Sequence, residues 1–201
     1  MAMLAPPAIR RREEPEWTVL LTVAVALLIG YFVMTMVQGQ TQAGTAGPQS
    51  VAYPAAWVQT SEPGATFAAA DLNRSGPFGP RVSLRQIAQK DLIPHWIGGG
   101  TPSLLDAAQA WSTQRGTDLV GYRVLKISPN DTQKPTSVDI ESGYLMEASA
   151  GSGAMPGLMH AIDTLKASGD SYYILTFAAD ANQFDRYSSV RDALLASWHT
   201  P

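Results

Sequence analysis

The sequence predicts an α+β fold: a mostly antiparallel sheet flanked by helices, an α-β-α sandwich, preceded by one transmembrane helix. Three observations lead to this prediction. An uncharged apolar run begins at Trp17. Apolar and polar residues alternate over residues 81–88 and 137–146, which is typical of half-buried strands. Apolar residues also recur at helical spacing over residues 102–114.

The apolar run covers residues 17–37 and reads WTVLLTVAVALLIGYFVMTMV. About 20 helical residues cross the roughly 30 Å hydrocarbon core of a bilayer. A core helix of a globular domain would need a polar stripe, and this run has none. A cleaved signal peptide is the other alternative, with a weak cleavage-like stretch at residues 41–43, but its apolar region usually spans only about 7–15 residues. We therefore predict a retained anchor. The residues expected to form this membrane anchor are Trp17, Leu20, Leu21, Leu27, Leu28, Gly30, Tyr31 and Phe32.

Basic residues predict the orientation of this helix. Arg10, Arg11 and Arg12 precede the span, and no Lys or Arg follows it before Arg74. The positive-inside rule then places residues 1–16 in the cytoplasm as a short tail. The expected location is a cell inner membrane, crossed once, with the C-terminal domain on the periplasmic or extracellular side.

The remaining chain divides into a tether and one domain. Residues 38–50 are rich in Gln, Gly, Thr and Ala without periodicity, so they are expected to form a flexible linker. The domain is expected over residues 51–201, a common size for a single domain. Its first half should contain strands at residues 51–60, 66–72 and 81–88, a loop at 91–101 and a helix at 102–114. Thr101 or Ser103 is expected to cap that helix.

The second half of the domain continues the alternation of strands and helices. Strands are expected at residues 119–127 and 137–146. Pro156 is suited to a first helical turn, so a helix is expected at residues 156–167. Residues 172–178 (YYILTFA) form the most apolar segment of the domain and are expected to be a central strand. Residues 182–198 should close the chain as a helix.

Composition excludes several classes of function. The chain has 201 residues and a formal net charge of -3, so no basic surface for nucleic acid is implied. It contains no cysteine, which excludes disulfides, thiolate catalysis and thiolate metal sites.

No set of residues predicts catalysis. His160 and Asp163 would share one side of the helix expected at 156–167, but two ligands do not make a metal site, and a solvated or capping pair is favoured. The Gly98–Thr101 turn precedes a helix and its amides suit an anion, yet it lacks the lysine of a phosphate loop, so a plain loop is favoured. We expect no enzyme activity, no cofactor and no metal.

Three segments together resemble a known family. They are VAYPAAW at residues 51–57, SLLDAAQAWSTQRGTDLVGYRVL at 103–125, and YYILTFAADANQFDRYSSVRDALLASW at 172–198. This pattern resembles the PsbP-like family, named for an extrinsic protein of photosystem II. The resemblance implies an α-β-α sandwich and a non-enzymatic domain that docks on a membrane complex. The chain departs from the family in having its own span, and no metal or cofactor residue of the family can be matched here.

The expected function is therefore that of a non-catalytic accessory subunit of a multi-subunit membrane complex, of respiratory or photosynthetic electron-transport type. Its partners would be the bilayer and other subunits of that complex. Thr22, Ala26 and Gly30 recur every fourth residue and would permit close packing with a neighbouring helix, although chance explains such a stripe equally well. The alternative is a free-standing, membrane-tethered module that binds a ligand or a protein.

Overall fold

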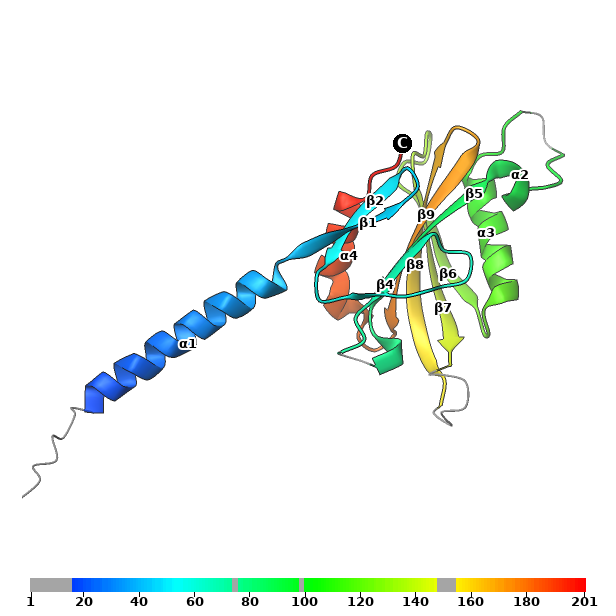
Figure 1. Ribbon diagram of the computed structural model, residues 1–201. Coiled ribbons are helices and arrows are strands. Elements are labelled where there is room, and N and C mark those ends of the chain that lie inside the picture. The colour runs from blue at the N-terminus through cyan, green and yellow to red at the C-terminus, as the bar shows by residue number, and fades with distance from the viewer. Residues whose placement is uncertain (1–15, 74–75, 98–99, 148–154) are drawn as a thin grey trace, which may run out of the picture. The chain divides into compact units, whose positions relative to one another are not determined.

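The computed structural model describes residues 16–73, 76–97, 100–147 and 155–201 (Figure 1). The chain divides after Gln40 into two compact units, which are described one at a time. Residues 1–15 of the predicted cytoplasmic tail, with Arg10–Arg12, lie outside the described residues, as do Gly98 and Gly99.

The first unit contains helix α1, Glu16–Gln38. Its stretch Trp17–Met36 is 20 residues long and, among the described helices, is the one apolar and long enough to cross a membrane. At 1.5 Å per residue it matches the hydrocarbon thickness. Trp17, Leu20 and Phe32 are among the predicted anchor residues whose side chains are exposed on this helix. The helix expected over residues 17–37 is thus confirmed.

The second unit is built on a seven-stranded sheet in which every neighbouring pair is antiparallel. This confirms the predicted fold class, and the strand expected at 172–178 is indeed central. The spatial order is β3 (Val58–Gln59), β4 (Phe67–Ala70), β5 (Arg81–Ala88), β9 (Ser171–Asp180), β8 (Gly157–Ser168), β7 (Val138–Met146) and β6 (Arg123–Pro129).

Two layers cover the sheet on opposite faces (Figure 1). Helix α3 (Leu104–Asp118) and the short α2 (Gln89–Leu92) pack on one face. Helix α4 (Ser188–Ser197) packs on the other, after a 3-10 turn η2 (Phe184–Tyr187). A second 3-10 turn, η1 (Gly76–Phe78), precedes β5. Side chains of β9 alternate between the faces, since Leu175 joins the α4 core and Ile174 joins the α3 core.

A capping box begins helix α3, as the sequence indicated for Ser103. The Ser103 hydroxyl accepts a hydrogen bond from the Asp106 amide, and the Asp106 carboxylate accepts one from the Ser103 amide. Two amides that the first helical turn leaves without partners are satisfied in this way.

The predicted linker over residues 38–50 is wrong for most of its length. Strands β1 (Thr41–Ala46) and β2 (Gln49–Pro54) pair as an antiparallel hairpin that joins the α4 core. The buried positions of β1 are Gly44 and Ala46, so the strand carries no large apolar residues and its alternation was invisible in the sequence. Gly44 is required because a Cβ there would lie 2.3 Å from the Phe67 ring.

The predicted helix over residues 156–167 is also wrong, because this segment is the twelve-residue strand β8. Every second side chain from Met159 to Leu165 is buried against the α3 face. Asp163 occupies one of these buried positions. Because a charged residue is expected on the exposed side of a strand, the alternation with a period of two could not be recognised in the sequence. The segment lies between β7 and β9, where its backbone completes two ladders.

Candidate functional site

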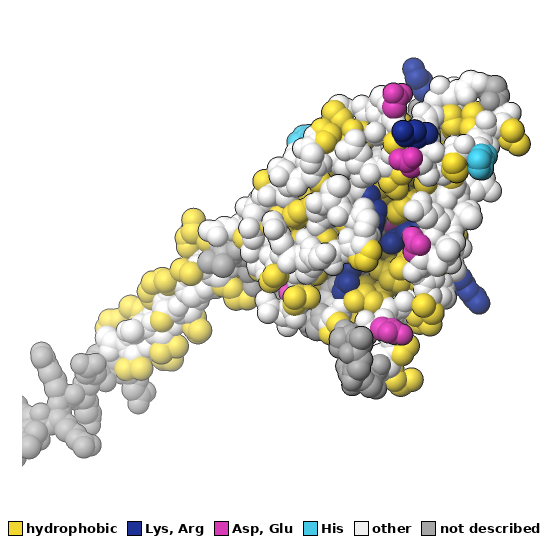
Figure 2. Space-filling model, turned by 45° about the vertical axis from the view of Figure 1, so that its right-hand side comes forward, with side chains coloured by type: hydrophobic (Ala, Val, Ile, Leu, Met, Phe, Trp, Pro, Cys, Tyr) yellow, Lys and Arg dark blue, Asp and Glu magenta, His cyan; other side chains and the backbone are white. Residues whose placement is uncertain are grey.

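A groove lies on the α3 side of the sheet. It has a volume of about 590 Å³ and is lined by the β3–β4 loop (Glu62, Pro63, Gly64), by β5 (Arg85, Ile87) and by α3 (Trp111, Arg115, Asp118). A second hollow of about 260 Å³ shares Glu62, Asp118 and Leu119 with it and extends to Tyr144 on β7. Figure 2 shows basic side chains recessed in a hollow of the surface, with acidic side chains beside them.

Strand and helix periods together place the charged side chains under this groove. On β5, Val82 and Leu84 enter the α4 core, so Ser83 and Arg85 point to the opposite face. On α3, Trp111 and Arg115 are four residues apart and share one side of the helix. Both elements therefore direct an arginine into the space between sheet and helix.

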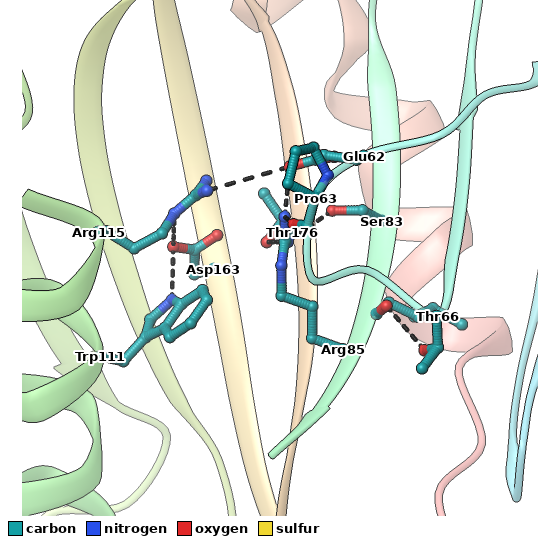
Figure 3. Close-up of polar contacts among 10 residues, drawn as sticks. Glu62, Pro63, Thr66, Ser83, Arg85, Trp111, Arg115, Asp163 and Thr176 are labelled. Atoms are coloured by element: carbon teal, nitrogen blue, oxygen red, sulfur yellow. Dashed lines mark hydrogen bonds and ion pairs between the residues drawn. The ribbon is translucent and has the colours of Figure 1, made fainter. Parts of the chain in front are cut away.

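Two arginines and two carboxylates form a buried network here (Figure 3). The Arg85 guanidinium donates to Glu62 and also to the hydroxyls of Ser83 (2.8 Å) and Thr176 (3.3 Å). Arg115 Nε lies 3.5 Å from Asp163 Oδ2, and Arg115 Nη1 lies 4.0 Å from Glu62 Oε1.

Trp111 links this network to the helix. Its indole N–H donates to Asp163 Oδ2 at 2.9 Å. The guanidinium carbons of Arg85 and Arg115 lie 5.7 and 5.5 Å from the centre of the indole ring, within cation–π range. The ring therefore lies beside both cations, while its N–H bonds one oxygen of the Asp163 carboxylate.

Burial makes these pairings energetically important. Arg85 and Arg115 are each 4% exposed, and Asp163 is fully buried. An unpaired charge in such a place would cost several kcal/mol. Burial by itself raises the pKa of Glu62, but the attraction of Arg85 and Arg115 outweighs it and holds that pKa below the usual 4.5. Burial tends to lower the pKa of Arg115, and Asp163 and its other neighbours reverse this, so the guanidinium stays charged.

Several buried polar atoms on this side of the sheet make no hydrogen bond within the described part of the chain. They are Arg81 Nε, Arg115 Nε, Tyr122 OH, Ser142 Oγ, Asp163 Oδ1 and Tyr172 OH. Such atoms are rare in native proteins, and two of them, Arg115 Nε and Asp163 Oδ1, belong to the network itself.

The structure separates the two residues considered as metal ligands. His160 and Asp163 are on β8, an odd number of residues apart, and point to opposite faces. His160 Nε2 lies 2.9 Å from Glu141 Oε1, and its ring stacks on Phe184 at 3.9 Å. Asp163 instead belongs to the network under α3. The described residues contain no group of three His, Cys, Asp or Glu side chains arranged for a metal.

The sequence did not single out Glu62, Arg85 or Arg115. A usable signal existed for Arg115, because it extends the buried stripe of α3 that contains Ala108 and Trp111. A charged residue on an apolar stripe is an anomaly that calls for a buried partner. The partners themselves, Glu62 and Asp163, lie far away in the sequence and carry no such signal.

Comparisons with known proteins support the fold. No protein-family model matches the sequence, and no curated protein matches it. The solution structure of cyanobacterial PsbP (CyanoP) from Synechocystis aligns with a TM-score of 0.53 and 14% identity, over 81% of this chain and 92% of that chain. The crystal structure of the Saccharomyces cerevisiae Ran-binding protein Mog1p aligns with a TM-score of 0.50 and 8% identity, over 80% and 95%. The crystal structure of LpqN of Mycobacterium tuberculosis aligns with a TM-score of 0.47 and 11% identity, over 81% of this chain and 91% of that chain. The alignments with PsbP and Mog1p show that the second unit has a PsbP/Mog1-like fold, as the sequence resemblance implied.

Proposed function

We propose that this chain is a non-catalytic accessory subunit of a multi-subunit membrane complex, which α1 anchors and whose neighbouring subunit the groove contacts. One observation carries the proposal. Only Gly39 and Gln40 separate the end of α1 at Gln38 from the start of β1 at Thr41.

This connection ties the folded domain closely to its anchor. An extended chain gains at most about 3.3–3.6 Å per residue, so Gln38 and Thr41 are never more than about 10 Å apart. The hairpin that Thr41 begins is not a loose arm, because Val51 and Tyr53 of β2 are buried in the α4 core. A domain held in this way meets partners at the membrane surface and has little reach for partners in free solution.

The proposed orientation in the membrane is the one that the sequence predicts. Arg10–Arg12 favour a cytoplasmic N-terminus, and the domain is then periplasmic or extracellular. The sequence resemblance to the PsbP-like family, named for an extrinsic protein of photosystem II, is the reason to expect a complex of electron-transport type. Mog1p is described as Ran-binding, so protein binding is one use to which this fold is put. The groove on the α3 face is the concave surface we assign to that contact.

Purification of the full chain in mild detergent tests the proposal. We expect a tagged chain to retain at least one other membrane protein in fixed stoichiometry. Inserting about 12 Gly/Ser residues between Gly39 and Gln40 should lower the recovered partner severalfold, because the tethered domain loses effective concentration at its contact. The control places the same insert after Pro201. Recovery of the chain alone, in detergents mild enough to keep known complexes together, would refute the accessory role.

A second candidate is a free-standing, membrane-tethered binding module. The groove favours it, since its volume of about 590 Å³ is within the range of small-molecule sites. In that case the purified chain would be free of other subunits but would carry a small molecule, which mass spectrometry of the extracted sample would detect.

A further inference from the structure

We propose that Arg81, Arg85 and Arg115 form a binding site for a carboxylate side chain of the partner protein, a site that the chain's own Glu62 fills only in part. This inference rests on the proposed function, because it names the chemistry of the partner segment that enters the groove.

The charges of the site are unequal. Arg85 and Arg115 line the groove, and Arg81 lines the adjoining hollow with Tyr144. All three arginines are buried or half-buried. The carboxylates recessed among them are Glu62 and Asp163. Three recessed cations therefore accompany two recessed carboxylates, so one further recessed carboxylate would balance the buried charges. The other acidic residues that line the two hollows, Asp91, Asp118 and Glu147, are exposed.

The hydrogen-bonding capacity of the arginines is also incompletely used. Arg81 Nε and Arg115 Nε are shielded from water and have no hydrogen-bond partner among the described residues. The contacts of Arg115 with its carboxylates are long, at 3.5 and 4.0 Å. A guanidinium offers five donors in a planar fork, and a carboxylate that faces the fork accepts two of them at once. Arg115 thus has Asp163 as its buried counter-charge but no well-formed hydrogen bond at Nε, so its fork retains donors for a further carboxylate.

Glu62 shows where such an acceptor enters. It is on the loop between β3 and β4, and its side chain is 29% exposed. The same oxygen, Oε1, faces both Arg85 and Arg115. Arg85 already uses its Nη atoms on Glu62, Ser83, Thr176 and the Pro63 carbonyl, so the hydrogen-bond donors left for an incoming carboxylate are those of Arg115. A second carboxylate arriving through the groove would either join Glu62 or displace it.

The walls define the segment that carries this carboxylate. Pro63, Ile87 and Leu119 give the groove apolar sides. Asp91 and Asp118 line the same groove and are exposed, so acidic residues that flank the entering carboxylate would be repelled. The fitting segment has one Asp or Glu with apolar or basic neighbours.

Binding of small probes to the full chain in detergent tests the site. The probes are N-acetyl-glutamate N-methylamide and its neutral isostere N-acetyl-glutamine N-methylamide, and the readout is the NMR signal of the Trp111 indole N–H. We expect the glutamate probe to bind at least about tenfold more tightly, the size of effect that one charge-assisted hydrogen bond gives. Glu62→Gln should strengthen its binding severalfold, because a competing carboxylate is removed.

Single variants distinguish the contribution of the arginine charge to probe binding from that of the planar guanidinium. Arg115→Lys keeps the positive charge but loses the fork, so it should weaken the glutamate probe about tenfold. Arg81→Gln, at a half-buried position, should weaken it as well and provides the test if Arg115→Lys does not fold. Asp192→Asn, exposed on α4 across the sheet, should leave binding unchanged.

Three results would overturn the site: equal binding of the two probes, binding unaffected by both arginine variants, or tighter binding of inorganic phosphate than of the glutamate probe. The proposed function fails separately. A chain that binds the glutamate probe but purifies without partners contradicts the accessory role alone. A partner that Arg115→Lys and Arg81→Gln capture as well as the natural chain does contradicts the carboxylate site alone.

Discussion

The pairing of Arg115 with Asp163 should dominate the stability of the α3 face. Their side chains are 5% and 0% exposed, and Arg115 Nε lies 3.5 Å from Asp163 Oδ2. We consider Arg115→Met, Asp163→Asn and the double variant. Asparagine is chosen because its amide oxygen retains an acceptor for the Trp111 indole N–H.

Because both side chains are buried, each single variant should lose a large part of the unfolding free energy. Removing one partner of a buried ion pair typically costs about 3–5 kcal/mol, because the other charge is left without compensation. The 3.5 Å separation is longer than a well-formed hydrogen bond, so each single variant should lose about 3 kcal/mol of unfolding free energy. In the double variant no charge of this pair is stranded, and the total loss should remain at about 3 kcal/mol. The coupling energy is then about 3 kcal/mol.

Urea titration of the full chain in detergent, followed by tryptophan fluorescence, measures these free energies. The control pair is Arg191 and Asp192 on α4, which is 2.9 Å apart but 25% and 64% exposed. Exposed pairs contribute little, so Arg191→Met should change stability by less than about 1 kcal/mol. Additive losses of about 6 kcal/mol in the Arg115/Asp163 double variant would refute the reasoning, since the pair would then not be coupled.

Three further predictions concern single positions. The pKa of Glu62 is held below 4.5, mainly by Arg85 working against burial, so its contribution to stability is present above about pH 4.5 and disappears as the pH falls through the lower, folded-state pKa. Urea midpoints measured from about pH 6 to pH 3 should fall less steeply in Glu62→Gln. Ser103→Ala removes the cap of α3 and should cost about 1 kcal/mol in the same assay. Gly44→Ala drives a methyl group into the Phe67 ring and should lower the unfolding free energy by about 1–3 kcal/mol. A double variant that also carries Phe67→Leu should recover part of this loss. An unchanged stability of Gly44→Ala would contradict the close packing of β1.

Local signals predicted most of the sheet and one helix well. Residues 81–88 alternate and form β5 with the bounds expected. The segment expected at 137–146 is β7, one residue shorter. The sequence offered Thr101 or Ser103 as the cap of α3, and Ser103 is the residue that forms it, through a contact with Asp106 three positions later.

The two wrong predictions, for β1 and β8, concern segments in which the buried residues are not large and apolar. Strand β1 buries glycine and alanine, which give no hydrophobic period. Strand β8 buries Asp163, while Leu158 and Ile162 on its other face completed an apparent helical spacing. In both segments the sheet ladders and the facing layer decided the conformation, and neither is visible in a short window of sequence.

The sequence alone predicts a helix long and apolar enough to cross a membrane, because a bilayer demands only length, apolarity and internally satisfied backbone groups, and a single helix meets all three locally. It also determined that the domain is an antiparallel sandwich. Only the tertiary structure brought Glu62, Arg85, Arg115 and Asp163 together, since each comes from a different element and the order of strands β5, β9 and β8 sets their separation. Buried charges are tolerated only where partners converge, and that convergence is a property of the folded sheet.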